Sequence, residues 1–296
     1  MNRRQSLSRL TACALFTACV MAAITSAHAQ IQVDVKLKRL QYIAYEPVVA
    51  TVAITNNTGR DIDLHDDAGQ HWFGFEVSGG EGQPIASSTT QPDPPLHIDS
   101  SKTVTRQINL SPVYQIQDFG TYHLRANIYF ADLGKYFYSQ SKAFQITDAR
   151  RIFQRTVGIP DGKPGAGGVR TYTLMTNTFP DHTSLYVRVE DKGSGAVYAT
   201  YSLGRLIAFD EPHADIDREN QLHVLHCSAP RTWSHSTVGL NGELVSHDTL
   251  LEAKTRPRLK RSAEGDIAIS GGILDKPIVR SGVNTAPKLS ERPLDD

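Results

Sequence analysis

The chain has 296 residues, and its formal charge is zero because 31 lysines and arginines balance 31 aspartates and glutamates. A balanced charge gives no electrostatic footprint for nucleic acid or for an anionic membrane, so neither is an expected partner. The length suffices for two domains. Beyond the first 29 residues the sequence has one cysteine, Cys227, so no disulfide within the chain is expected to stabilise the fold.

The first 29 residues have the three zones of a cleavable signal peptide. Three arginines make a positively charged start, and an apolar run follows over residues 10–24. The run ends at residues 27–29, Ala-His-Ala, the small-x-small pattern that a signal peptidase cuts after. An apolar run of about 15 residues is too short to span a bilayer. We therefore expect residues 1–29 to be removed, and the mature protein to start at Gln30, without a membrane span, in the periplasm or outside the cell.

Two variants of this export signal remain open. Arg3 and Arg4 partly resemble a twin-arginine signal, although Ser6 stands where that pattern prefers an aromatic residue. Cys13 or Cys19 would be a lipidated cysteine in the second variant, but either would leave most of the apolar run on the mature protein. Cleavage by any of these routes removes the three N-terminal arginines from the mature protein. Removing three arginines and no acids leaves 28 basic against 31 acidic residues, a net charge of −3.

Residues 30–148 alternate apolar and polar side chains at period two, which predicts half-buried β-strands. Turn-forming residues at 56–59, 78–80 and 91–95 separate these runs. Six or seven strands in a segment of roughly this length are typical of a β-sandwich.

Residues 118–124, Asp-Phe-Gly-Thr-Tyr-His-Leu, resemble the Asp-x-Gly-x-Tyr-x-Cys corner of immunoglobulin-like domains. In that family the glycine permits a tight turn, and the tyrosine hydroxyl bonds back to the backbone. The resemblance therefore implies structural roles for Asp118, Gly120 and Tyr122. It says little about function, because this sandwich carries many unrelated activities.

One position departs from the family pattern. Leu124 stands where the disulfide cysteine would be, and Val52 or Ile54 is expected to face it. The resemblance therefore implies an immunoglobulin-like β-sandwich without the disulfide over residues 30–148. The alternative is a hairpin corner in another all-β fold.

Residues 149–171 are expected to form a linker or loop, because glycine and proline are frequent over 158–169. A Gly-Lys pair in this segment does not predict a phosphate-binding loop. No serine or threonine follows Lys163, Pro164 removes a backbone donor, and no helical pattern follows.

Residues 172–275 return to the strand pattern and contain an internal repeat, in which residues 185–197 resemble 234–245. The spacing resembles that of β-propeller-type hairpin repeats, but the segment is too short for a ring of four blades. An all-β fold is expected throughout: a sandwich, then a second β domain of repeated hairpins, either incomplete and propeller-like or a sandwich. Residues 276–296 show no periodicity and are expected to be a disordered tail.

Two acidic clusters are candidates for a divalent metal. The first alternates with Ile62 and Leu64 on an expected strand, and the second precedes an expected strand at 222–227. Strand and turn chemistry explains both clusters, so we expect neither to bind a metal tightly. The candidate residues are Asp61, Asp63 and His65 in the first cluster and Asp215, Asp217 and Glu219 in the second.

The other candidates lie in the second half of the chain. His223 and His226 are three residues apart, so a strand sends them to opposite faces and they cannot bind one metal without a bulge. Cys227 is expected to be a buried hydrophobic residue rather than a nucleophile. Five aromatic residues are expected to serve mainly as core, with a stacking or interface surface as the alternative. They are Tyr172, Tyr186, Tyr198, Tyr201 and Trp233.

No catalytic or cofactor signature stands out, so no cofactor is expected and the protein is not expected to be an enzyme. We expect an exported, non-catalytic binding or assembly protein of the cell envelope that engages a protein or glycan partner. The alternatives are a hydrolase of glycans, whose carboxylates need only meet in space, and a protease-inhibitor-like sandwich.

Overall fold

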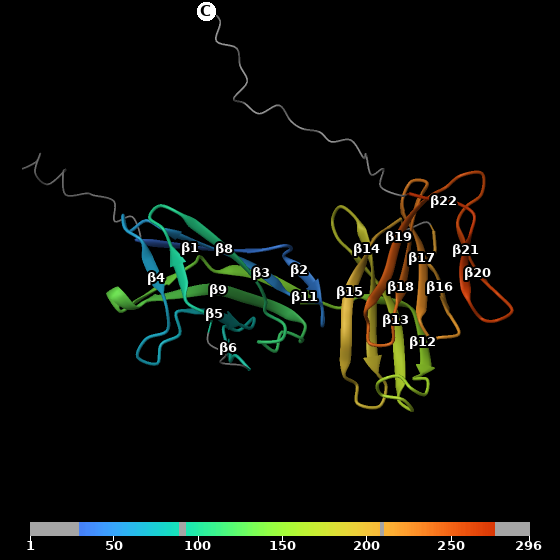
Figure 1. Ribbon diagram of the computed structural model, residues 1–296, viewed down its shortest axis with the longest axis horizontal. Helices are drawn as coiled ribbons and strands as arrows, with labels where there is room; N and C mark the ends of the chain where they lie inside the picture. Colours follow the sequence, from blue (N-terminus) through green and yellow to red (C-terminus); the bar gives the residue numbers. More distant parts are fainter. Residues whose placement is uncertain (1–29, 89–92, 208–209, 276–296) are drawn as a thin grey trace, which may run out of the picture. The chain divides into compact units, whose positions relative to one another are not determined.

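The computed structural model describes residues 30–88, 93–207 and 210–275 (Figure 1). Over these residues the regular secondary structure is β-strand apart from one 3-10 turn, as the period-two pattern predicted. It divides into two compact units, here called unit 1 (up to Thr147) and unit 2 (from Asp148). No helix among the described residues is long and apolar enough to cross a membrane. The expected signal peptide and C-terminal tail lie outside the described residues.

Unit 1 is a β-sandwich with two main sheets. The smaller sheet has the order β1 (Ile31–Leu37), β3 (Val49–Asn56), β8 (Thr103–Asn109). The larger sheet has the order β2 (Gln41–Ile43), β11 (Lys142–Thr147), β9 (Gly120–Phe130), β5 (Phe73–Ser78), β6 (Pro84–Ile85), and β10 (Lys135–Tyr138) pairs with β9. A 3-10 turn (Ala131–Leu133) joins β9 to β10, and β4 (Ile62–Leu64) pairs with β7 (Leu96–Ile98).

The core of unit 1 lies between these two sheets. Alternate residues of β3 are buried, as period-two burial of one strand face requires. Leu124 of β9 is fully buried in the same cluster as Val52 and Ile54 of β3. Hydrophobic packing therefore joins the two sheets at the position where the sequence resemblance placed a missing disulfide.

The turn before β9 contains the hydrogen bond expected of a corner tyrosine. The Tyr122 hydroxyl donates to the backbone carbonyl of Asp118 at 2.8 Å. The Tyr122 ring is buried and stacks on Phe144, with ring centroids 5.5 Å apart. Gly120 has a φ of 149°, which side chains disfavour, so a glycine is required at the start of the strand.

We expect Tyr122→Phe to lower the free energy of unfolding of unit 1 by about 1–2 kcal/mol, because it removes one partner of a partly buried hydrogen bond. The chain has two tryptophans, Trp72 in unit 1 and Trp233 in unit 2. Urea unfolding followed by Trp72 fluorescence in a Trp233→Phe background therefore reports on unit 1. Tyr138→Phe, at an exposed tyrosine, is the control and should leave the midpoint unchanged. Coinciding midpoints for Tyr122→Phe and its parent would contradict the corner role.

Unit 2 contains two antiparallel meanders. The first sheet has the order β12 (Arg150–Gly158), β13 (Val169–Thr178), β14 (Thr183–Asp191), β15 (Val197–Leu206). The second has the order β16 (His213–Ile216), β17 (Leu222–Ala229), β18 (Thr232–Val238), β19 (Leu244–Leu251), β22 (Ile273–Leu274). A separate hairpin is made by β20 (Arg258–Arg261) and β21 (Ile267–Ser270).

The two meanders of unit 2 share one core, so this unit is a second sandwich rather than a propeller-like stack. The core combines Leu174 and Val187 of the first sheet with Leu222 and Val224 of the second. The opposite face of the second sheet, here called the outer face, carries another apolar cluster around Trp233. The β20–β21 hairpin packs against that outer face, beside β16 and β17 (Figure 1).

The structure differs from the expected linker at residues 149–171. Strand β12 occupies Arg150–Gly158, and Ile152, Phe153 and Val157 pack on the core of unit 2. β-branched and aromatic residues suit an edge strand, and the glycine-rich composition of the following residues masked this signal. The loop is confined to 159–168, where several glycines have a positive φ.

Candidate functional site

Among the described residues, Asp61, Asp63 and His65 of the first acidic cluster do not converge on one ligand position. Asp63 lies on β4 and its carboxylate is 2.7 Å from His97 Nδ1, whereas the Asp61 carboxylate accepts the backbone N–H of Ser100. Within residues 30–88, 93–207 and 210–275, one group of at least three histidine and carboxylate side chains brings its ligand atoms within 4.8 Å. It consists of Asp61, His97 and Asp99, so His65 is not part of it. All three are exposed, and the hydrogen bond that His97 donates to the Asp63 carboxylate raises the pKa of His97.

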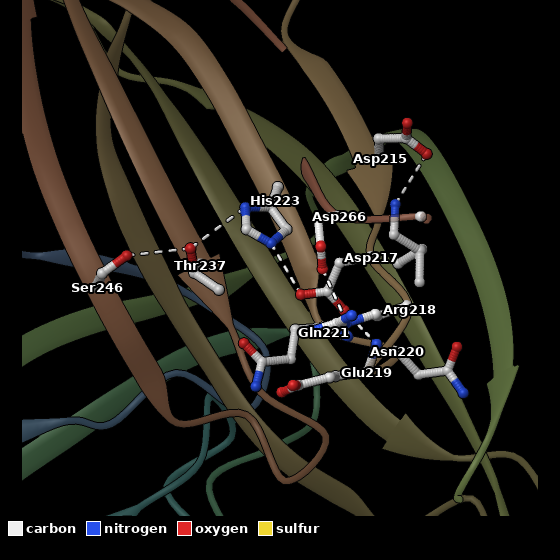
Figure 2. A network of polar contacts seen from close by, with 12 residues as sticks. Asp215, Asp217, Arg218, Glu219, Asn220, Gln221, His223, Thr237, Ser246 and Asp266 are labelled. Atoms are coloured by element: carbon white, nitrogen blue, oxygen red, sulfur yellow. Dashed lines mark hydrogen bonds and ion pairs between the residues drawn. The ribbon is translucent and has the colours of Figure 1, made fainter. Parts of the chain in front are cut away.

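The second acidic cluster is a turn whose carboxylates do not converge. The Asp217 carboxylate accepts the backbone N–H groups of Glu219 (2.9 Å) and Gln221 (2.8 Å), which is the turn chemistry predicted for aspartate. Asp215 instead pairs with Arg261 of the β20–β21 hairpin at 2.5 Å. Asp215 and Asp217 therefore have separate structural partners, and among the described residues the side chains of 215, 217 and 219 form no group with ligand atoms within 4.8 Å of one another (Figure 2).

A network of polar side chains continues from this turn across the outer face of the second sheet (Figure 2). The other Asp217 oxygen lies 3.0 Å from His223 Nε2 on β17. His223 Nδ1 in turn lies 3.1 Å from His235 Nε2 on the neighbouring strand β18. We call His223 and His235 the histidine pair. Both residues are less than 10% exposed, and their rings are nearly parallel, 19° apart.

Two hydroxyl groups extend the network to β19. Ser246 donates to Thr237 at 3.0 Å, and the Thr237 oxygen lies 3.4 Å from His223 Nδ1. Because Thr237 accepts from Ser246, its own hydroxyl proton is free to point at His223 Nδ1, which is then an acceptor. This agrees with His223 Nε2 carrying the proton and donating it to Asp217. Burial lowers the pKa of His235, and the neighbouring His223 lowers it further.

His226 lies on the opposite face of the same sheet, as the spacing from His223 predicted. Its side chain is fully buried beside Gly204 of β15, and neither ring nitrogen has a hydrogen-bond partner among the described residues. Burial lowers the pKa of His226 to about 4, and His247 contributes in the same direction. Cys227 is buried in the outer-face cluster, as expected, and burial raises its pKa.

Unit 1 contains a cleft of about 690 Å³ along β5. Its lining combines aromatic and aliphatic side chains with amide, imidazole and carboxylate groups, a composition typical of ligand sites. The lining residues are Gly69, Gln70, His71, Phe73, Gly74, Phe75, Glu76, Ser87, Asp93, Pro94, Ile108, Leu110, Val113, Tyr114, Asn127, Tyr136 and Tyr138.

Three tyrosines of β9 and β10 form an aromatic surface next to this cleft. The Tyr129 and Tyr136 rings are 5.0 Å apart, and the Tyr136 and Tyr138 rings are 6.0 Å apart. We call these three residues the tyrosine platform. Tyr136 and Tyr138 remain 37% and 43% exposed, and the Tyr136 hydroxyl donates to the Gln70 amide oxygen. The platform is therefore partly exposed at the edge of the cleft, with Arg125 over the Tyr138 ring.

The space beside the platform depends on a glycine. Gly74 pairs with Asn127, and Asn127 pairs with Tyr138, so the three positions form one row across β5, β9 and β10. A Cβ atom at residue 74 would lie 2.9 Å from the Asn127 side-chain oxygen. Any larger residue at position 74 would displace Asn127 and fill this part of the cleft.

The tyrosine platform lies outside the five aromatic residues considered from the sequence. Tyr172, Tyr186 and Trp233 are buried, as the core interpretation predicted, and Tyr198 is exposed. The missed signal was the Tyr-Phe-Tyr alternation at 136–138, because a strand places the two tyrosines on one face.

No protein-family model matches the sequence, and no curated protein matches it. Among solved structures, the sporulation control protein Spo0M of Bacillus subtilis is similar with a TM-score of 0.26 and 9% identity. The similarity covers 59% of this chain and 91% of that protein. A likeness of this size carries no argument about function.

Proposed function

We propose that this chain is an exported, non-catalytic binding protein whose unit 1, an immunoglobulin-like sandwich, binds a glycan in the cleft beside the tyrosine platform. Export is supported by the charged, apolar and small-x-small zones of residues 1–29. The immunoglobulin-like assignment is supported by the hydrogen bond from Tyr122 to Asp118. The exposed platform at the cleft edge is the observation that carries the binding proposal.

The composition of the cleft favours a glycan over a protein partner. Its volume of about 690 Å³ suits an oligosaccharide segment and is small for a protein interface. The partly exposed rings of Tyr136 and Tyr138 provide apolar area, and Gln70 and Asn127 provide donors and acceptors for hydroxyl groups. A sugar ring presents the same combination, an apolar face with a polar edge.

The carboxylates of the cleft support binding rather than hydrolysis. Glu76 pairs with Arg125 at 2.5 Å, and Asp93 pairs with Arg106 at 2.6 Å. A general acid of a glycoside hydrolase requires an environment that favours the protonated carboxyl, such as an apolar pocket. Each of these carboxylates is engaged by an arginine, so neither lies in an apolar pocket of that kind.

We expect Tyr138→Ala to weaken binding of a glycan roughly tenfold, which corresponds to about 1.4 kcal/mol, because it removes one of the two partly exposed rings that line the cleft. Binding by the mature protein is measured on an array of neutral and N-acetylated oligosaccharides, and the best ligand is titrated by calorimetry. Gly74→Val should have a larger effect and abolish binding, because the valine side chain displaces Asn127 and fills this part of the cleft.

Tyr198→Ala is a closely matched control. Tyr198 lies in unit 2, is 48% exposed, and has an arginine (Arg170) 4.2 Å from its ring, as Tyr138 has Arg125 at 4.2 Å. Its replacement should leave the affinity unchanged. Equal affinities of Tyr138→Ala, Gly74→Val and the parent protein would refute the cleft as the site. Hydrolysis of the bound oligosaccharide would refute the non-catalytic role.

A further inference from the structure

The histidine pair of unit 2 brings two imidazole nitrogens face to face in a nearly buried position. His223 Nδ1 and His235 Nε2 are 3.1 Å apart, on neighbouring strands whose register is set by the β17–β18 hairpin. The nitrogens that point away from this contact both face carboxylates. His223 Nε2 lies 3.0 Å from Asp217, and His235 Nδ1 lies 3.9 Å from Asp248.

The protons of two neutral imidazoles do not satisfy these four positions. Asp217 accepts, so the proton of His223 sits on Nε2 and its Nδ1 presents a lone pair to His235. If His235 donates from Nε2, its Nδ1 is left with a lone pair directed at Asp248. That nitrogen is buried and has no hydrogen-bond partner within the described part of the chain. If the proton moves to Nδ1, two lone pairs face one another at 3.1 Å instead.

A cation between the two rings removes this conflict. Both facing nitrogens then use their lone pairs, and both outer nitrogens carry protons that point at Asp217 and Asp248. We propose that His223 Nδ1 and His235 Nε2 bind one divalent transition-metal ion of the zinc or copper class. Neutral imidazole is a preferred ligand of both metals.

The distances agree with this assignment. With metal–nitrogen bonds of about 2.0–2.1 Å, two ligand atoms at a tetrahedral angle are about 3.4 Å apart. His223 Nδ1 and His235 Nε2 are 3.1 Å apart, so the two side chains need to move apart only slightly to reach this spacing. The carboxylates of Asp217 and Asp248 take the place of the outer groups that orient metal-binding histidines. The Thr237 oxygen lies 3.4 Å from His223 Nδ1, which is close to the spacing of two ligands of one tetrahedral ion.

A proton is the other cation that would fit between the rings. The carboxylates of Asp217 and Asp248 face the outer nitrogens of the pair. Two arginines of unit 2 are engaged in ion pairs, Arg261 with Asp215 and Arg218 with Asp266. The measurements below distinguish a metal ion from a proton.

The test is a calorimetric titration of the untagged mature protein with Zn²⁺ and with Cu²⁺ at pH 7.5. We expect one ion per chain, and at least a tenfold loss of affinity in His223→Gln and in His235→Gln. His226→Gln replaces a buried histidine on the opposite face of the same strand, so it is the matched control and should bind as the parent does. His97→Gln tests the exposed group at Asp61 and Asp99 and should also leave this ion bound.

A spectroscopic measurement keeps the proposal testable if a variant of the pair does not fold. The Cu²⁺ form of the parent protein should show hyperfine coupling to two imidazole nitrogens in electron paramagnetic resonance. The proposal is overturned if no ion binds, if the ion is lost in His97→Gln alone, or if both variants of the pair bind as the parent does. An imidazolium form of His235 at pH 7 in nuclear magnetic resonance spectra would also overturn it, because the cation would then be a proton.

Discussion

Replacing Leu124 with alanine should lower the free energy of unfolding of unit 1 by about 2–5 kcal/mol, the range for leucine truncation in a well-packed core. Leu124 is fully buried, and it packs with Val52 and Ile54 where the two sheets of the sandwich meet. In the described part of the chain the cysteine is Cys227, in unit 2, so this junction is held by packing alone. The truncation removes apolar contacts and leaves a cavity that the two sheets can only partly close.

Urea unfolding followed by Trp72 fluorescence, in the Trp233→Phe background, measures this effect. Leu40→Ala makes the same chemical change at a residue of unit 1 that is 68% exposed, and it should shift the midpoint by no more than about 0.5 kcal/mol. If the two truncations have equal effects, Leu124 does not occupy the centre of the core.

Unit 2 should lose stability in mild acid because of His226. Its pKa is lowered to about 4 in the folded protein, first by burial, whereas the unfolded chain titrates near 6.5. Between these two values the unfolded state binds a proton that the folded state excludes. The stabilisation is therefore complete above pH 6.5 and is lost as the pH falls toward 4, by about 3 kcal/mol over that interval. Unfolding followed by Trp233 fluorescence from pH 7.5 to pH 4, in a Trp72→Phe background, measures this loss.

His226→Leu should flatten this pH dependence, because leucine has no proton to bind and resembles the imidazole in size. The unbonded ring nitrogens also disappear, so the variant should be no less stable than the parent at pH 7. His213→Leu replaces an exposed histidine of the same sheet and should keep the pH dependence of the parent. A parent-like acid loss in His226→Leu would assign the effect to other groups.

Local patterns in the sequence predicted the parts of this protein that depend on chain neighbours. Period-two alternation identified β1, β3 and β9, because a strand sends adjacent side chains to opposite faces whatever it packs against. The same rule placed His223 and His226 on opposite faces, and the turn chemistry of aspartate explained Asp217. The motif before β9 predicted the hydrogen bond of Tyr122 for a similar reason, because its donor and acceptor lie four residues apart.

Tertiary structure alone decided which distant residues meet. His235 joins His223 through the register of two strands, and Asp248 joins them from a third strand. The tyrosine platform likewise needs β10 to fold back on β9, so that Tyr136 lies opposite Tyr129. A linear pattern specifies the face of each strand but not its partner or its register, since these depend on the packing free energy of whole sheets. The sequence therefore determined an all-β chain, whereas the cleft and the histidine pair arose from strand pairing.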